Sequence, residues 1–170
     1  VTITPQVDLL NYAKGFFFGE DYASRLDYQC VNEDLNRNAT LDSSEDLNHD
    51  LALSPRKADV AVSVETVGTD GKTDANGRII LRETYPRSTA TCVKNALKVS
   101  GSVDGSEGRA SWIEWAPYPA TALSGSGAPA FVTSPYGVVT EDVTLTAGTV
   151  LPDGPSYVTD QILTPCQNPT

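Results

Sequence analysis

Short segments that alternate apolar and polar residues recur along the chain and predict β-strands. The clearest covers residues 58–67, where Val60, Val62 and Val64 fall on one face and small or polar residues fall on the other. Residues 138–146 alternate in the same way and are predicted to form the last strand. Because helix signals are nearly absent, the pattern favours an all-β protein.

Turn residues separate these segments at regular intervals. The pairs Asp70-Gly71, Asn76-Gly77 and Asp104-Gly105 each favour a tight turn. The remaining strands are predicted over residues 7–18, 78–85, 89–103 and 109–115, and residues 22–30 connect the first of these to the stretch that follows. Regularly spaced short strands joined by such turns predict an antiparallel β-sandwich.

The two ends and one internal stretch have a different composition. Val1–Thr4 is a short β-prone arm that Pro5 should stop, and such an arm can pair at home or with a neighbouring copy. Residues 117–137 are rich in Pro, Ala, Gly and Ser and predict a loop. We therefore expect one domain over residues 1–146 and an extended, Pro-rich C-terminal tail over 147–170.

The stretch from Asn32 to Pro55 places oxygen-bearing side chains at the spacing of an EF-hand-type calcium loop. Loop positions 1, 3, 5, 7, 9 and 12 are held by Asp34, Asn36, Asn38, Thr40, Asp42 and Glu45. Calcium prefers about six to eight hard oxygen ligands, and this spacing lets one turn of chain surround an ion. The stretch therefore predicts a bound calcium ion, and the alternative is an acidic loop that is merely solvated.

The loop restarts after twelve residues, because the motif Glu-Asp-Leu-Asn at residues 33–36 recurs at 45–48. Positions 1, 3 and 5 of the second copy are Asp46, Asn48 and Asp50. Positions 10 and 12 are Pro55 and Lys57, so we expect the second copy not to form an independent site. We predict one strong ion, with the second copy holding a weaker ion or joining the same cluster.

Position 6 of each copy departs from the calcium-loop pattern. The usual Gly turns the chain through a positive φ, but Ala39 and Leu51 stand there. A Cβ in that conformation costs about 1–2 kcal/mol. We therefore expect modest affinity, which suffices outside cells, where such modules bind at about 10⁻⁴ to 10⁻³ M. No amphipathic helices flank the loop, which argues against a helix-loop-helix sensor.

Composition narrows the function classes. The 170 residues suit one domain, and 12 Lys and Arg against 22 Asp and Glu give a net charge of −10. Six of the acids lie between Glu33 and Asp50, which cations explain more simply than a generally repulsive surface. No basic stripe favours nucleic acid, and no apolar run is long enough to span a bilayer. Because the chain begins at Val1, we expect a processed or trimmed chain.

Three cysteines allow one disulfide and leave one thiol. Cys30 abuts the predicted calcium loop and Cys166 lies in the tail, whereas Cys92 lies in a predicted strand. We predict a Cys30–Cys166 disulfide that ties the tail to the base of the loop, with Cys92 buried. The alternative is three free thiols in a reducing cell.

The residues argue against catalysis and leave a binding surface open. The only histidine, His49, lies in the acidic loop, where exposure beside a metal explains it better than a role as general base. We therefore predict that the protein is not an enzyme. Trp112, Trp115 and Tyr118 could form a surface for a glycan or a protein partner, with burial of the indoles under the Pro-rich loop as the alternative.

Several motifs together resemble bacterial surface and secreted proteins with immunoglobulin-like domains that carry an inserted calcium loop. The most specific is the loop segment that runs from Cys30-x-Asn32-Glu33-Asp34 to Glu45-Asp46-x-Asn48. The shorter ones are Tyr12-x-Lys14-Gly15, Lys72-Thr73-Asp74-Ala75-Asn76-Gly77, Tyr85-Pro86, Gly105-Ser106-Glu107-Gly108 and Ser134-Pro135-Tyr136-Gly137. The resemblance implies an immunoglobulin-like β-sandwich and calcium held by Asp34, Asn36, Asn38, Asp42 and Glu45. It also implies that Cys92 fills a core position where that group has an aromatic residue.

These observations give two expectations for function. The first is a calcium-stabilised structural or adhesive module, extracellular or on the bacterial cell surface. It could assemble into a fibre or pilus-like filament if the N-terminal arm or the tail pairs with another copy. The second is a carbohydrate-binding module that uses exposed Trp and Tyr side chains.

Overall fold

The computed structural model describes residues 1–18, 28–65, 72–118, 131–152 and 159–168, and in these ranges the protein is all-β, as predicted. All of its strand pairs are antiparallel. The strands are β1 (Thr2–Lys14), β2 (Phe16–Phe18), β3 (Tyr28–Val31), β4 (Ala61–Glu65), β5 (Ile80–Thr84), β6 (Val93–Val103), β7 (Ser106–Trp115), β8 (Phe131–Thr133), β9 (Val143–Leu145) and β10 (Gln161–Leu163). Two 3₁₀ turns, η1 (Lys57–Asp59) and η2 (Pro165–Gln167), complete the regular structure. Among the described residues, no helix is long and apolar enough to cross a membrane.

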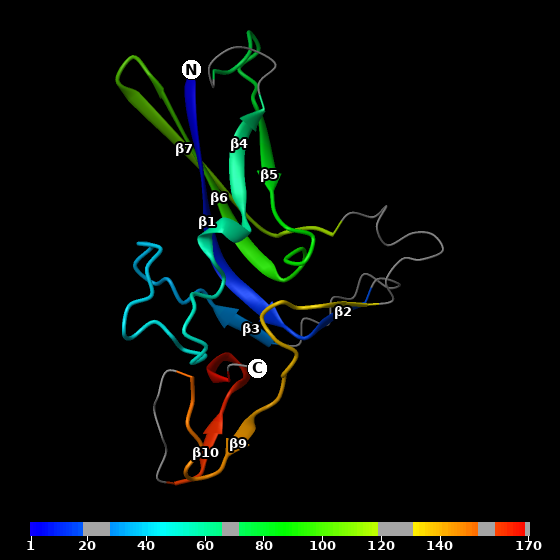
Figure 1. Cartoon of the computed structure of the whole chain (residues 1–170). Helices are drawn as coiled ribbons and strands as arrows, with labels where there is room; N and C mark the ends of the chain where they lie inside the picture. Colours follow the sequence, from blue (N-terminus) through cyan, green and yellow to red (C-terminus); the bar gives the residue numbers. More distant parts are fainter. Residues whose placement is uncertain (19–27, 66–71, 119–130, 153–158, 169–170) are drawn as a thin grey trace.

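A four-stranded sheet in the order β3-β1-β6-β7 forms the centre of the molecule (Figure 1). β1 pairs with β6 over nearly its whole length and with β3 only from Asn11 to Lys14. The prediction that Pro5 stops an N-terminal arm was wrong, because Thr2–Thr4 and Pro5 all belong to β1 and pair with β6. Proline fits there since β3 does not reach this part of β1, so an N–H is not needed on that edge. The N-terminal arm therefore pairs within its own chain.

The hairpin of β6 and β7 confirms the predicted turn at Asp104-Gly105. Both residues have positive φ, 46° and 81°, as two-residue hairpin turns of the favoured type require. The pairing runs without interruption from Lys94 opposite Trp115 to Val103 opposite Ser106. β7 has a partner only on its β6 side, so it forms one edge of the central sheet.

The β4–β5 hairpin makes a second layer against the central sheet. The alternation predicted for residues 58–67 is present in β4, whose valines are half-buried while its other residues are exposed. Val60, just before β4, packs with Leu9 of β1, Val93 of β6 and Ala116 after β7. These four buried side chains form the core, and Val7, Tyr85 and Tyr136 pack around it.

The C-terminal part ends in a further strand that the alternation did not predict. Residues 143–145 form β9, but β10 follows and pairs with it. Beyond β10, η2 carries Cys166, whose disulfide to Cys30 is present as predicted. The bond joins the C-terminal segment to β3, at the base of the acidic loop. Cys92 is a buried free cysteine, also as predicted.

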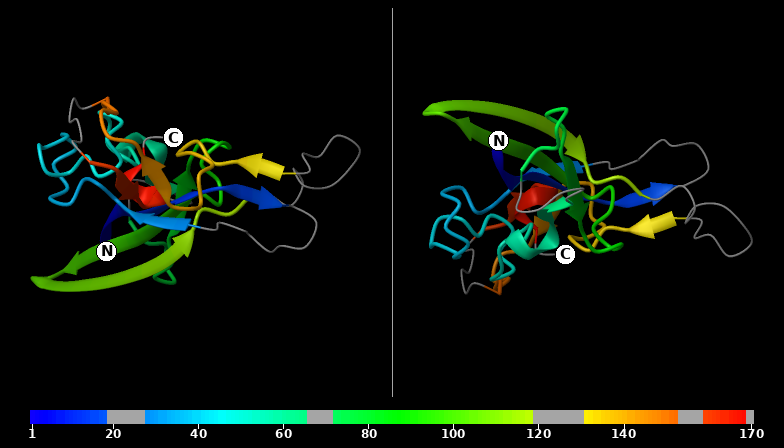
Figure 2. Two further views of the ribbon diagram at one scale, coloured as in Figure 1. Left: turned by 90° about the horizontal axis from the view of Figure 1, so that it is seen from below. Right: turned by 90° about the horizontal axis from the view of Figure 1, so that it is seen from above.

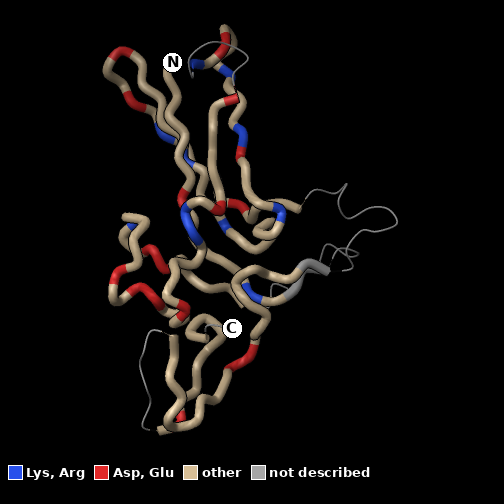
Figure 3. Tube along the Cα trace, viewed as in Figure 1, with Lys and Arg blue, Asp and Glu red and all other residues tan. Residues whose placement is uncertain are grey.

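The acidic loop and the β2–β8 pair project from opposite sides of the body, as the views from below and above agree (Figure 2). The Asp and Glu residues of the stretch 33–50 lie along this one projecting loop (Figure 3). Parts of the predicted turn at 68–77, of the segment 22–30, of the loop at 117–137 and of the tail lie outside the described residues.

Candidate metal-binding loop

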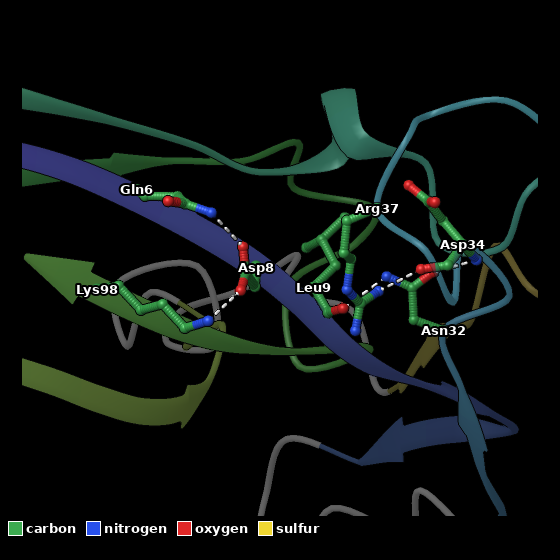
Figure 4. A network of polar contacts seen from close by, with 7 residues as sticks. All are labelled: Gln6, Asp8, Leu9, Asn32, Asp34, Arg37 and Lys98. Carbon is green, nitrogen blue, oxygen red and sulfur yellow. Dashed lines mark hydrogen bonds and ion pairs between the residues drawn. The ribbon is translucent and has the colours of Figure 1, made fainter.

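The loop begins where β3 ends, and its first residues are fixed to β1. The Asn32 backbone N–H donates to the Leu10 carbonyl at 2.9 Å, and its Nδ2 donates to the Leu9 carbonyl at 2.5 Å (Figure 4). The Asn32 Oδ1 in turn accepts the N–H of Asp34 at 2.9 Å. Arg37 Nη1 donates to the Asp34 carbonyl at 2.8 Å. The first predicted ligand is therefore held by side chains that pack on the central sheet.

The first copy folds around the side chain of Asp34. Its two carboxylate oxygens accept the N–H groups of Asn38 and Ala39 at 2.9 and 3.0 Å. Asp42 Oδ2 accepts the side-chain amides of Asn36 and Asn38 at 2.7 and 3.0 Å. These bonds bring four of the predicted ligands into one turn of chain.

The two remaining predicted ligands of the first copy have different surroundings. Glu45 is buried, and its carboxylate accepts the N–H groups of Leu35 at 3.0 Å and Asp42 at 3.2 Å. It reaches back across the loop, as position 12 does in the EF-hand pattern. Thr40 is exposed and donates its N–H to Asn38 Oδ1 at 2.6 Å, at the position where calcium loops use a backbone carbonyl as ligand.

The second copy repeats this arrangement twelve residues later. The Asp46 oxygens accept the N–H groups of Asp50 and Leu51, both at 3.1 Å. Asn48 Oδ1 accepts the Asp50 N–H at 3.1 Å, and Asn48 Nδ2 donates to Asp50 Oδ2 at 3.1 Å. The repeat seen in the sequence is therefore a repeat of structure as well.

Both copies use left-handed backbone at the same two positions. The φ values of Ala39 and Leu51 are both 63°, and those of Arg37 and His49 are 62° and 59°. Ala39 and Leu51 thus adopt the conformation for which calcium loops normally use Gly, at a cost of about 1–2 kcal/mol each. Both copies keep this strained conformation at the same loop position, which indicates that the local turn is required for the function of the loop.

Glu33 is the site residue that sequence reasoning missed. It is fully buried, and its Oε1 accepts the N–H groups of Leu47 and Asn48 at 3.2 and 3.1 Å. Its Oε2 accepts the Ser54 N–H at 2.9 Å, while the Glu33 N–H donates to the Ser54 carbonyl at 3.0 Å. The signal was available, because Glu33 opens the repeated motif that Glu45 opens in the second copy.

Three carboxylates from the two copies meet beside β1. One oxygen each from Glu33, Asp46 and Asp50 lies within 4.8 Å of the others. Oxygens bound to one calcium ion at about 2.3–2.6 Å can be up to about 5 Å apart, so this spacing fits a shared ion. Burial raises the pKa of the Glu33 carboxyl to about 7, opposed by the N–H donors of Ser54 and Asn48 and assisted by the charges of Asp50 and Asp46. A divalent cation would hold the same carboxyl ionised.

Buried charge is the main electrostatic feature of the loop. Glu33, Asp34 and Glu45 are all nearly inaccessible. Their oxygens accept backbone N–H groups, which orient a carboxylate but carry no full positive charge. Because burying an ionised carboxylate without a counter-charge is costly, this arrangement suits a hard cation such as calcium.

The aromatic residues predicted as a ligand surface do not share one face. Trp112 and Trp115 lie three residues apart on a regular strand, so their side chains leave opposite faces of β7. Trp112 is 64% exposed and donates its Nε1–H to Glu114 at 2.8 Å. Trp115 is half-buried with the Lys94 ammonium 5.9 Å from its ring centre, and the Tyr118 hydroxyl accepts a bond from Arg87 at 2.7 Å.

Comparison of the chain with protein-family models, curated proteins and solved structures gives no match.

Proposed function

We propose that the chain is an extracellular structural or adhesive surface module in which calcium ions stiffen the loop of residues 32–55. The observation that carries the proposal is the burial of Glu33, Asp34 and Glu45 in two turns whose first aspartates accept the N–H groups four and five residues ahead. Without a cation, these turns concentrate negative charge in a poorly solvated place. With calcium, the same oxygens become ligands, and the loop becomes a rigid part of the surface.

An immunoglobulin-like sandwich on the bacterial cell surface is the architecture we propose for this module. In support, the β4–β5 hairpin packs through Val60 on the face of the central sheet that carries Leu9 and Val93. The Cys30–Cys166 disulfide supports an oxidising compartment, where such bonds persist. The disulfide also supports a mechanical role, because it fixes the base of the loop to the C-terminal segment.

Assembly into a fibre would need an edge other than the N-terminal arm. Thr2–Thr4 pairs with β6, and β10 pairs with β9, so both terminal segments are engaged within the chain. The outer edge of β7 is the place where strand addition would continue the central sheet. Sedimentation at high protein concentration tests this: a monomer throughout would contradict self-assembly.

Thermal unfolding with calcium and with a chelator tests the calcium proposal. A ligand that binds only the folded state stabilises it by about 2.7 kcal/mol when its free concentration is 100 times Kd. We expect calcium to raise the melting temperature by several degrees, magnesium to do less, and Glu45→Gln to reduce the calcium-dependent shift. Equal melting temperatures in calcium and chelator would contradict the proposal. Glu141→Gln, at an exposed position outside the loop, is the matched control.

Glycan binding is a second candidate function because Trp112 is so exposed and its indole N–H already contacts a carboxylate. An indole held in this way could stack on a sugar ring while Glu114 accepts a hydroxyl. Titration with a glycan panel should then quench tryptophan fluorescence, and Trp112→Ala should abolish the quenching. Quenching that survives in this variant would place the ligand elsewhere.

A further inference from the structure

We propose that the second copy of the loop is a complete calcium site of its own, closed by Glu33 and backed by the hydroxyl of Tyr12. This inference rests on the proposed calcium binding and goes beyond it, because it assigns a second ion and two residues outside the EF-hand spacing, Glu33 as a ligand and Tyr12 beside the ion or its bound water. The second copy lacks a carboxylate at its own position 12, and Glu33, which precedes the first copy in the sequence, takes that role.

The hydrogen bonds show how the two copies exchange their closing residues. Glu45, which directly precedes the second copy, accepts the N–H groups of Leu35 and Asn36 in the first. Glu33, which directly precedes the first copy, accepts those of Leu47 and Asn48 in the second. The donors of the second copy lie twelve residues after those of the first, and the acceptor Glu33 lies twelve residues before Glu45. The two copies are thus reciprocal halves, and what stands at positions 10 and 12 of the second copy is irrelevant to its closure.

The second copy also has the more compact carboxylate set. Among the described residues, one group of three Asp, Glu, His or Cys side chains has ligand atoms close enough together to bind one ion. It consists of Glu33, Asp46 and Asp50. Asp46 and Asp50 come from the turn of the second copy, and Glu33 comes from before the first copy, so that turn alone does not supply the set. Asn48, which is also buried, lies between them in the sequence and contacts Asp50.

An independent observation at this place comes from Tyr12 of β1. Its side chain is fully buried, and its hydroxyl has no hydrogen-bond partner within the described structure. Burial raises its pKa, the charges of Glu33, Asp50 and Asp46 act in the same direction, and the neighbouring side chain of Asn48 acts against them. A buried hydroxyl without a partner is costly, and in proteins it usually contacts an ordered water or an ion. A calcium ion at the cluster, or water bound to that ion, would satisfy it.

The local charge matches a divalent ion. Lys14 is the buried cation on the same side of β1, with Asp50 and Glu33 as its acidic neighbours. Its ammonium donates to the Asn168 carbonyl at 2.5 Å, so it also ties the C-terminal segment to this place. Three carboxylates and one ammonium leave two negative charges, which a single Ca²⁺ would balance. Carboxylate and amide oxygens and water are the ligands that calcium prefers.

Calcium stoichiometry in the whole chain tests the inference, with Ca²⁺ alone as the probe in equilibrium dialysis and titration calorimetry. The wild type should bind two ions. Asp50→Asn places at position 5 of the second copy the residue that the first copy already has in Asn38, so it should fold. We expect it to weaken one site by at least about tenfold and leave the other unchanged. Tyr12→Phe should weaken the same site.

The first copy provides the matched control. Asp42→Asn should weaken the other site alone, and the double variant with Asp50→Asn should retain no strong binding. One ion in the wild type, with an isotherm that Asp50→Asn does not change, would overturn the inference and leave the proposed calcium module standing. Loss of both ions in Asp50→Asn would also overturn it, because the copies would then form one shared site. No binding in the wild type would overturn the proposed function as well. Circular dichroism of each variant checks folding.

Discussion

Glu83 is a carboxylate that the fold places between the two layers of the molecule. It lies on β5, and its Oε1 accepts the side-chain amide of the buried Asn95 on β6 at 2.6 Å. Burial raises the pKa of Glu83, and the neighbouring carboxyl of Glu114 raises it further through a hydrogen bond and its charge. The ionisation of Glu83 therefore makes the contact between β5 and β6 sensitive to pH.

The sign of that linkage gives a prediction. An acid with a higher pKa in the folded state stabilises folding fully below its unfolded value of about 4.3. This contribution is lost as the pH rises through the folded value. We expect Glu83→Gln to remove the loss, so the variant should gain stability relative to the wild type as the pH rises from about 4. Urea unfolding across pH measures this difference. The stability difference between Glu141→Gln, at an exposed position, and the wild type should not change with pH. If the difference between Glu83→Gln and the wild type is also the same at every pH, the prediction is wrong.

The β6–β7 hairpin depends on its turn at the level of a single element. Gly105 has φ +81°, and a Cβ at this position would meet no atom within 4 Å. Any effect of a side chain there is therefore due to the backbone and not to a clash. Gly108, three residues further along, lies in β7, and a Cβ there also meets open space, without the positive φ. The two glycines form a matched pair.

We expect Gly105→Ala to destabilise the protein by about 1–2 kcal/mol, the cost of a Cβ in left-handed backbone. Gly108→Ala should be neutral or stabilising by about 0.5–1 kcal/mol, since it only removes the entropy of glycine in a strand. Chemical denaturation of both variants measures the two effects. Equal effects would mean that the turn is not formed as described.

The Cys30–Cys166 disulfide acts at the scale of the whole molecule. It closes a sequence separation of 136 residues and joins the base of the acidic loop to η2. Lys14 and Asn168 meet behind the same joint, so the C-terminal segment is held covalently and by a buried hydrogen bond. The disulfide and this hydrogen bond therefore attach the C-terminal segment to β3 and to β1, at the base of the loop.

Removal of the disulfide should lower the stability of the protein substantially. The chain-entropy model gives about 4–5 kcal/mol for a loop of this length. We expect Cys30→Ser together with Cys166→Ser to lower the free energy of unfolding by that order, measured in urea. Alkylation after unfolding without reductant should label one thiol, Cys92, in the wild type. Three labelled thiols would contradict the disulfide.

Local patterns predicted a large part of the fold. The alternation around Val62 appears in β4, and Asp104-Gly105 forms the hairpin turn, because both depend on interactions within a few residues. The Cys30–Cys166 pair was predictable because only three cysteines had to be sorted. The repeat of the loop was predictable for the same local reason, since each Asp binds N–H groups four and five residues ahead.

Tertiary structure alone decided the features that join distant parts of the chain. Pro5 lies within β1 because β3 leaves that edge uncovered. Glu33 closes the second copy, and Tyr12 and Lys14 lie behind it, because β1 and the doubled loop fold against each other. The sequence by itself determined which oxygens recur and how each turn is made. Only the packing of two turns on one sheet determined which carboxylates meet, since that depends on contacts that no local spacing encodes.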